Sequence, residues 1–415
     1  MKKALIAVLF STVFMFAMHS TVYGGVGITD TEIHIGQFSP QTGPAAAWGA
    51  VARGTDAYFE WINANGGIHG RKLVHHYFDD AYNPARTIAG VKQLQERRRG
   101  IFAWVGGVGT APGLAVKDYL MQKEVIWVGP AAGSRHWIDP PQKYLFNVYP
   151  LYLADAQLLS EYAVSEMGKK RIAVVYQEDD YGEQGVEGAR YSLEKHGMEL
   201  VAEVPVALGD SDMRPHTMRL RRSDADAVLL FVTPIAASRI IGTGSAMNYN
   251  PQWMSTTTIA DCPLMIDVTQ GLYEGVITAN FGLRTDDEEI GDYQHIDNPR
   301  LELMHTYRTE VFDQYAARDE RWGYTWNVGI GLAEPLVEAI KRAGPDLTRE
   351  KVLEELENME NFQGIFGKIS YKPFDPEDPL TRIGQTQIFL HQCDAEGGSY
   401  ILTDWTETDY IPIDN

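Results

Sequence analysis

A glycine-rich turn between a predicted strand and a predicted helix is the segment best suited to hold a small anion. Residues 104–112 are Trp-Val-Gly-Gly-Val-Gly-Thr-Ala-Pro, which places Thr110 as the expected N-cap of the helix. Free backbone N–H groups, the helix dipole and a hydroxyl would together suit a carboxylate. A dinucleotide fingerprint does not fit, because Pro112 occupies the third glycine position. An ordinary threonine-capped turn is the alternative.

A second turn of small residues follows the next predicted strand. Residues 129–134 are Gly-Pro-Ala-Ala-Gly-Ser. Two neighbouring strands that end in small residues leave room for a ligand at the carboxyl edge of a parallel sheet, where open α/β folds place their sites. It is the repetition that predicts a ligand site. Arg135 and His136 could add positive charge there, although we favour an exposed loop pair.

Two aromatic residues also follow predicted strands. Trp48 comes after Gly43-Pro44 and could cover an apolar ligand, or simply pack on its own helix. Tyr181 follows the acidic run 178–180 and could close over a ligand from a second lobe, or lie in a solvent-facing turn.

The sequence contains no recognisable catalytic motif. There is no Gly-x-Ser-x-Gly elbow, no P-loop and no His-Glu-x-x-His motif. His75 and His76 are neighbours in a predicted strand and so point to opposite faces. Asp79 and Asp80 could form a metal or acid–base pair, but turn and helix-capping roles are favoured. We therefore expect no enzyme, no metal site and no cofactor.

Alternating strands and helices position these turns. We expect a first series of strands at 33–38, 72–78, 101–105 and 125–129, with helices at 51–62, from Pro84 behind an Asn83 cap, and at 112–122. A second series begins after Asn147, with strands at 171–176, 200–206, 227–233, 252–256 and 276–280 and helices at 155–167 and 181–196. An acidic surface loop at 284–299, helices at 301–317, 325–343 and 348–358, and strands at 368–371, 386–392 and 399–402 complete the chain. Such alternation indicates parallel sheets covered by helices on both faces.

Length and charge narrow the function classes. A chain of 415 residues is too long for one ordinary core, so two lobes are expected. With 44% hydrophobic and 22% charged residues the chain is globular. Its formal net charge of −20 repels phosphate backbones and anionic lipid surfaces, so nucleic acid is not an expected partner.

The first 24 residues resemble a secretory signal peptide. Two lysines are followed by an apolar run at 4–18, which is short for a membrane span, and cleavage is expected before Gly25. No cysteine follows the run, so a lipid anchor is not expected and the mature protein should be free in the periplasm. Cys262 and Cys393 could form a disulfide in that compartment, but we favour two unpaired, buried thiols, because cysteines so far apart do not mark a disulfide framework.

The order and spacing of these segments resemble the leucine/isoleucine/valine-binding type of periplasmic solute-binding protein, which serves ABC importers. The resemblance is strongest over residues 30–282. It rests on Ile35-Gly36, Gly43-Pro44, Trp48-Gly49, 62–70 (Ile-Asn-Ala-Asn-Gly-Gly-Ile-His-Gly), Asp79-Asp80 with Pro84, 106–110, 129–132 and 180–183 (Asp-Tyr-Gly-Glu).

The resemblance implies a type I periplasmic binding protein: an α/β chain with two doubly wound parallel-sheet lobes joined by a three-segment hinge. The crossings would fall near Val148, Phe281 and Phe362. Lobe one would comprise 27–148 plus 282–361, and lobe two 149–281 plus 362–415. Such a protein would trap a small carboxylate, an amino acid or an aromatic or apolar acid, for a membrane permease. A ligand sensor of the same fold is the alternative, and an exported enzyme is the less favoured one.

The resemblance also assigns ligand-binding positions. A wall falls on Trp48, a closing tyrosine on Tyr181, a further contact on Thr233 and a second aromatic wall on Tyr324, with Trp326 nearby. The carboxylate cradle falls on Val108, Gly109, Thr110, Ala131, Ala132 and Gly133.

Two departures from the family pattern stand out. Amino-acid binders have an acid for the ligand's ammonium where this chain has Thr257. Either Asp179, Asp180 or Asp261 supplies the charge, or the ligand has no ammonium, because burying one without an acid costs several kcal/mol. The family's small-loop disulfide is the second departure, since its two positions fall on Tyr82 and Gly109.

Overall fold

A computed structural model of the protein describes residues 25–282, 298–394 and 398–413. The expected signal peptide and most of the expected acidic loop at 284–299 lie outside these residues. Within the described residues, no helix is both long enough and apolar enough to cross a membrane.

The first lobe is built on a five-stranded sheet in the order β2-β1-β3-β4-β5, with every pair parallel. Apolar residues are buried on both faces of β1, as expected for a parallel strand covered by helices on each side. Its strands are β1 (Glu32–Ser39), β2 (Lys72–Asp79), β3 (Ala103–Val105), β4 (Ile126–Val128) and β5 (Leu145–Phe146), and its first helices are α1 (Ala50–Ala64), α2 (Pro84–Gln95) and α3 (Thr110–Gln122).

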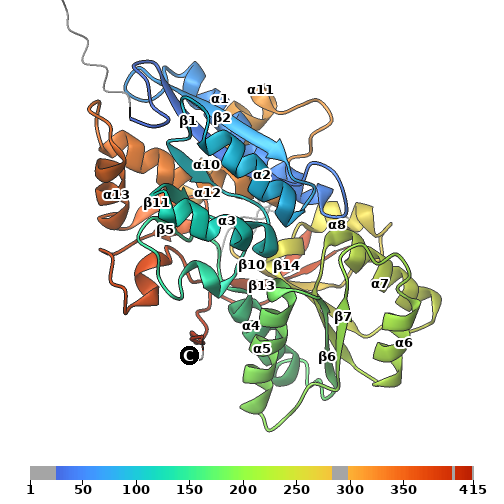
Figure 1. Ribbon diagram of the computed structural model, residues 1–415. Coiled ribbons are helices and arrows are strands. Elements are labelled where there is room, and N and C mark those ends of the chain that lie inside the picture. The colour runs from blue at the N-terminus through green and yellow to red at the C-terminus, as the bar shows by residue number, and fades with distance from the viewer. Residues whose placement is uncertain (1–24, 283–297, 395–397, 414–415) are drawn as a thin grey trace, which may run out of the picture.

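The second lobe is built on a seven-stranded sheet in the order β14-β13-β10-β9-β8-β6-β7. Strands β10, β9, β8, β6 and β7 run parallel to one another. Strands β13 and β14 are added antiparallel at the β10 side of the sheet. The strands are β6 (Ile172–Gln177), β7 (Ala202–Val206), β8 (Ala227–Phe231), β9 (Gln252–Ser255), β10 (Ile277–Asn280), β13 (Phe389–Cys393) and β14 (Ser399–Ile401), and the helices are α4 (Tyr152–Ser165), α5 (Asp180–Glu194), α6 (Arg214–Arg222), α7 (Pro234–Ala246) and α8 (Cys262–Val268). The predicted α/β class with two lobes is therefore confirmed (Figure 1).

Residues after β10 return to the first lobe. Helix α12 (Tyr324–Arg342) lies against α1, and Gly329 allows this contact, because a β-carbon there would stand 1.9 Å from the Val51 carbonyl oxygen. The other elements are α10 (Asn298–Thr306), a π-helical segment η4 (Tyr307–Phe312), α11 (Asp313–Tyr315), α13 (Arg349–Glu357) and the antiparallel hairpin β11 (Phe362–Gly364) and β12 (Gly367–Ile369).

The chain passes between the lobes three times: from β5 to α4, from β10 to α10 and from β12 to β13. The first and third passages lie side by side, because Asn147 pairs with Ile383 and the Asn147 amide donates to the Arg382 carbonyl at 2.9 Å. The residue bounds assigned to each lobe remain a prediction.

Three local expectations were wrong. Thr110 is the first residue of α3 and Gly109 is its N-cap, since Gly109 has the positive φ of 102° that turns the chain. The single helix expected at 301–317 is divided by the π-helical segment, which places both Tyr307 and Val311 in the core.

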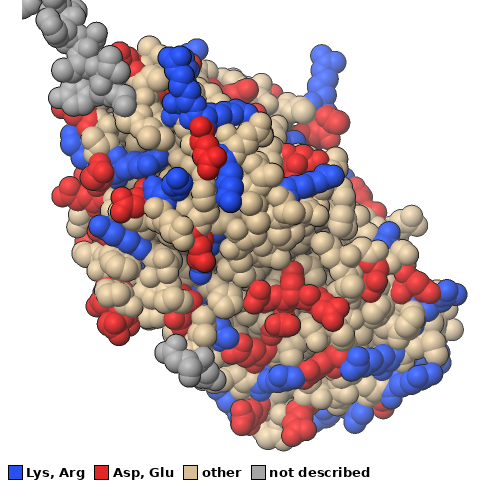
Figure 2. Space-filling model, viewed as in Figure 1, with Lys and Arg blue, Asp and Glu red and all other residues tan. Residues whose placement is uncertain are grey.

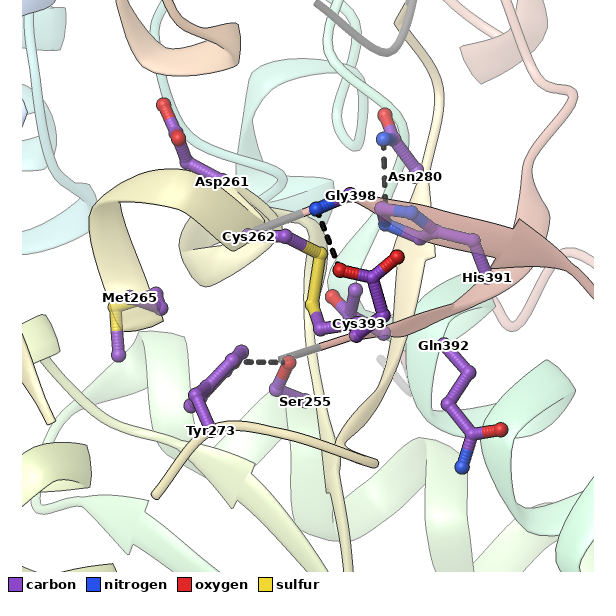
Figure 3. Close-up of a disulfide and its surroundings, with 12 residues drawn as sticks. Ser255, Asp261, Cys262, Met265, Tyr273, Asn280, His391, Gln392, Cys393 and Gly398 are labelled. Carbon is purple, nitrogen blue, oxygen red and sulfur yellow. Dashed lines mark hydrogen bonds between the residues drawn. A yellow bond between two sulfur atoms is a disulfide. The ribbon is translucent and has the colours of Figure 1, made fainter. Parts of the chain in front are cut away.

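The third wrong expectation concerns the cysteines, which form a disulfide with Cα atoms 5.5 Å apart (Figure 3). Cys262 begins α8 and Cys393 ends β13, so the bond ties a helix to the sheet edge that the chain adds last. The two cysteines are 131 positions apart, so no local sequence pattern indicated that they are close in space.

Charged side chains of both signs are interspersed on the face shown in Figure 2, where no single basic patch gathers.

Candidate functional site

A cavity lies between the two lobes, at the carboxyl ends of strands from both sheets. Seven of the predicted ligand-binding residues line it: Trp48, Val108, Gly109, Ala131, Tyr181, Thr257 and Tyr324. The remaining lining residues were not predicted: Val51, Tyr82, Tyr149, Tyr152, Thr258, Thr325 and Val328.

Aromatic rings form most of the cavity wall. Trp48 and Tyr82 have ring centroids 5.7 Å apart on the lobe-one side, and Tyr152 and Tyr181 have centroids 4.6 Å apart on the lobe-two side. The unpredicted Tyr82, Tyr149 and Tyr152 all lie within a few residues of the ends of β2 and β5. Their position just beyond parallel strands was the one signal that could have marked them.

Direct hydrogen bonds hold the two lobes together around this cavity. Trp48 Nε1 donates to the Thr258 carbonyl at 2.9 Å. The Thr325 amide at the start of α12 donates to Asp261 Oδ2 at 3.0 Å. Inside lobe two, the hydroxyl groups of Tyr181 and Thr258 are 2.8 Å apart, which fixes the tyrosine over the cavity. The structure is therefore a closed form.

The first predicted turn lines the cavity with Val108 and Gly109, and Thr110, the next residue, is not among the lining residues. Thr110 is fully buried, and in the part of the chain that the structure describes its Oγ1 has no hydrogen-bond partner. The amides of Thr110 and Ala111 open α3 and have no earlier carbonyl in the helix to bond. A buried hydroxyl with free helix amides can receive a carboxylate.

The backbone amides of two other residues of the predicted cradle, Gly109 and Ala131, already donate hydrogen bonds within lobe one. The Gly109 amide donates to the Ala131 carbonyl at 3.3 Å, and the Ala131 amide donates to the Gly107 carbonyl at 2.9 Å. Ala132 and Gly133 do not line the cavity. A β-carbon at Gly133 would lie 2.3 Å from the Pro150 carbonyl oxygen, so this glycine allows the lobe connection to pass close by.

Thr233 and Trp326 lie away from the cavity. Thr233 caps α7 by accepting the Ala236 amide at 3.3 Å, and it lines a separate hollow with Pro44 and Gln177. Trp326 packs edge-on against Phe312, with ring centroids 5.1 Å apart.

An acid that the sequence did not single out lies behind Thr257. Asp155, in the first turn of α4, accepts the Thr257 amide at 3.0 Å and the Thr257 hydroxyl at 2.8 Å, both on Oδ2. Burial raises the pKa of the Asp155 carboxyl to about 7. Its Oδ1 is buried and has no partner among the described residues. No sequence signal linked these two residues, which are 102 positions apart.

The three acids that the sequence offered for an ammonium have other partners. Asp179 caps α5 through the Tyr181 amide at 3.1 Å, and burial raises the pKa of its carboxyl. Asp180 pairs with His136 at 3.4 Å, and this hydrogen bond lowers the pKa of the Asp180 carboxyl. Asp261 accepts the Leu264 and Thr325 amides, and its pKa is raised by burial.

Arg135 and His136 are not the exposed pair that we favoured. Arg135 forms an ion pair with Glu187 of α5 at 2.7 Å, and its side chain is only 13% exposed. Because both residues pair with α5, they join the second turn of lobe one to lobe two.

The residues considered for metal or acid–base chemistry have structural partners. His75 Nδ1 lies 2.9 Å from Asp56, and Asp80 accepts the Tyr82 amide and the Thr87 hydroxyl. Asp79 accepts the Ala81 amide of its own turn at 2.9 Å, as favoured, and also the Gln41 and Thr42 amides of the segment that follows β1. Among the described residues, no group of three histidines, cysteines or acids could hold a metal ion.

A family model described as "Periplasmic binding protein" matches residues 32–382, which cover most of the chain. The chain belongs to the periplasmic binding protein family. The resemblance to the leucine/isoleucine/valine-binding group is thereby confirmed, and transport and solute binding are the functions of this family.

Curated relatives of this periplasmic binding protein carry names from that group. Leu/Ile/Val-binding protein homolog 3 of Brucella melitensis is 31% identical over 201 residues, 48% of this chain and 53% of that protein. The leucine-specific-binding protein of Salmonella typhimurium is 21% identical over 252 residues, 60% of this chain and 68% of that protein. The chain spans about half the length of the first of these relatives.

Solved structures share the fold of this periplasmic binding protein. A substrate-binding periplasmic protein from Ralstonia solanacearum matches with a TM-score of 0.78 at 24% identity, covering 89% of this chain and all (100%) of that chain. A fatty acid ABC transporter substrate-binding protein from Thermomonospora curvata matches with a TM-score of 0.79 at 22% identity, covering 94% of this chain and 95% of that chain. A branched-chain amino acid ABC transporter protein from Thermus thermophilus with bound valine matches with a TM-score of 0.76 at 20% identity, covering 91% of this chain and 97% of that chain.

Proposed function

We propose that this protein is the substrate-binding component of an ABC importer of the branched-chain amino acid type. It traps a small carboxylate-bearing solute between its lobes in the periplasm and delivers it to a membrane permease. It catalyses no reaction. Family membership and the names of the relatives support this role.

The observation that carries the proposal is the cavity between the lobes, which is lined by aromatic rings and by Gly109, the N-cap of α3. The fully buried Thr110 hydroxyl, which has no partner among the described residues, is the receptor for the carboxylate. The rings of Trp48, Tyr181 and Tyr324 enclose the rest of the solute. Because these walls are apolar and aromatic, they suit amino acids with large apolar side chains and the corresponding acids.

Thermal unfolding of the full chain in the presence of candidate solutes tests the proposal. The panel pairs leucine, valine and phenylalanine with acids that lack the amino group, and adds fatty acids because one structural neighbour is named for them. A solute at about 100 times its dissociation constant should add about 2.7 kcal/mol of stability. If uncharged amides of the same solutes stabilise the protein as strongly as the free carboxylates do, a carboxylate site is excluded.

A further inference from the structure

The last described residues of the chain cross from lobe two to lobe one. Within the described residues, no helix or strand follows β14. The chain first stays at the edge of lobe two, where Thr406 and Ile388 exchange backbone hydrogen bonds at 2.7 and 3.0 Å. Residues 409–413, which we call the C-terminal strap, come next. Figure 1 shows this end of the chain near α4.

One end of the C-terminal strap is attached to two helices of lobe two. The Asp409 carboxylate forms an ion pair with Lys195, the C-cap of α5, at 2.5 Å, and accepts the Tyr191 hydroxyl at 3.3 Å. The Asp409 carbonyl accepts the side-chain amide of Gln157 in α4 at 2.9 Å. An exposed ion pair alone contributes little stability, but Gln157 is buried, so its hydrogen bond is shielded from water.

The other end of the C-terminal strap is attached to lobe one. The Tyr410 hydroxyl donates to Asp139 Oδ2 at 2.6 Å, and the Ile413 amide donates to the same oxygen at 3.0 Å. Arg135 Nη1 lies 3.4 and 3.3 Å from the carbonyl oxygens of residues 411 and 412. Both lobe-one partners are charged groups, which form stronger hydrogen bonds than neutral ones do.

The C-terminal strap spans a junction that must separate when the cavity opens. Arg135 also contacts lobe two directly, through Glu187 at 2.7 Å and through its amide to Gln184 Oε1 at 2.9 Å. Gln184 in turn donates to Ser134 Oγ at 2.9 Å. Tyr181 lines the cavity from the same helix, one turn before Gln184. A movement of α5 that uncovers Tyr181 therefore also pulls Gln184 away from lobe one.

We propose that the C-terminal strap fastens the two lobes in the closed form, so that its lobe-one end must detach before the cavity opens. Each of its hydrogen bonds to lobe one exists only while the lobes are together, and such bonds shift a two-state equilibrium toward the closed form. None of residues 409–413 lines the cavity, so the strap acts without touching the solute. The inference rests on the proposed function only for its consequence, which is slower release of a trapped solute.

Small-angle X-ray scattering of the solute-free protein tests the inference. We compare the full chain with a chain that ends after Thr408, which keeps the pairing of Thr406 with Ile388, and with Tyr410→Phe, which loses one bond to Asp139. Both changes should increase the radius of gyration, and the truncation should do so more strongly. With leucine as the probe, stopped-flow measurements should show dissociation at least about fivefold faster from the truncated chain.

A matched variant separates this role from general damage. Tyr400→Phe removes the hydroxyl of a β14 tyrosine that is 63% exposed, and it should leave the radius of gyration unchanged. Melting curves show whether the truncated chain folds, and Tyr410→Phe decides the question if it does not. The same radius of gyration in the full chain and in every folded strap variant would overturn the strap and leave the proposed function intact. An increase in the strap variants, with no binding by any carboxylate of the panel, would support the strap and refute the proposed function.

Discussion

The ring of Tyr82 lies directly on Gly109, so that a β-carbon at Gly109 would stand 2.3 Å from Tyr82 Cε2. These are the two positions at which the family resemblance places a small-loop disulfide. Here an aromatic ring packed on a glycine joins the end of β2 to the turn before α3 instead. Since both residues line the cavity, this packing also shapes the site.

Gly109→Ala should destabilise the protein by about 2–4 kcal/mol, because it combines a positive φ of 102° with a clash against the Tyr82 ring. Chemical denaturation would measure the change. Gly168→Ala is the matched control, since Gly168 also has a positive φ but a β-carbon there meets nothing within 4 Å. Equal losses in the two variants would show that the ring contact contributes nothing.

Thr110→Val should weaken every carboxylate ligand by about 1–3 kcal/mol, because the buried hydroxyl would no longer donate a charge-assisted hydrogen bond. Calorimetry with the best ligand of the panel measures this loss. Thr110→Ser keeps the hydroxyl and should retain most of the affinity. An unchanged affinity in Thr110→Val would mean that the carboxylate binds elsewhere in the cavity.

Trp48→Phe should favour the open form, because it removes the hydrogen bond from Nε1 to the Thr258 carbonyl across the lobes. The loss of about 1 kcal/mol should reduce ligand affinity roughly fivefold and increase the radius of gyration of the free protein in small-angle X-ray scattering. Trp61→Phe removes an indole hydrogen bond to Glu310 at the surface of lobe one and serves as the control. It should leave both quantities unchanged.

Replacing both Cys262 and Cys393 by serine should lower the free energy of unfolding by about 3–5 kcal/mol, since the disulfide links residues 131 positions apart. Differential scanning calorimetry would show the lower melting temperature. Dithiothreitol under denaturing conditions should destabilise the natural chain but not the double variant. A double variant that melts with the natural chain would contradict a structural role for the bond.

Glu334 should make the protein less stable as the pH rises from about 4.5 to 7. This carboxyl lies in the core of lobe one, where it accepts the Tyr307 hydroxyl at 2.6 Å and the Ile365 amide at 2.8 Å, and burial raises its pKa to about 7. The folded protein therefore keeps the proton to a higher pH than the unfolded chain. The stability from this proton is fully present below about pH 4.5 and is lost as the pH approaches 7, up to about 3 kcal/mol in total.

Melting curves of Glu334→Gln between pH 4.5 and 7.5 test that expectation. Glutamine mimics the protonated acid, so the variant should lose less stability over this interval than the natural chain does. Asp155 contributes to the slope in both proteins and cancels in the comparison. Parallel curves would exclude a titrating Glu334.

Much of the fold could be predicted from local pattern. Apolar runs of strand length alternate with helical periodicity, and Asn83 caps α2 by accepting the Ala85 and Arg86 amides, as expected. Seven predicted site residues reached the cavity because the carboxyl ends of parallel strands meet at one edge of a sheet.

What could not be predicted depends on contacts between distant segments. The Asp155–Thr257 pair and the disulfide join residues 102 and 131 positions apart, and no local pattern specifies such distances. Tyr149 and Tyr152 line the cavity from the first passage between the lobes and the start of α4, and only their place shortly after β5 could have marked them. Thr110 was predicted as the N-cap of α3 but is its first residue, because Gly109 adopts the positive φ of the turn and serves as the N-cap.

The order in which the strands of the second sheet are synthesised has a consequence for folding. β10 pairs with β13, and β13 is separated from it in the chain by the whole of α12, α13 and the β11–β12 hairpin. While the protein emerges from the ribosome, one side of β10 therefore stays exposed until residues 389–401 arrive. A nascent chain stalled before this point would carry β10 as an unpaired edge strand, which can pair with other chains. The sheet of lobe two is therefore complete only when β13 and β14 have been synthesised.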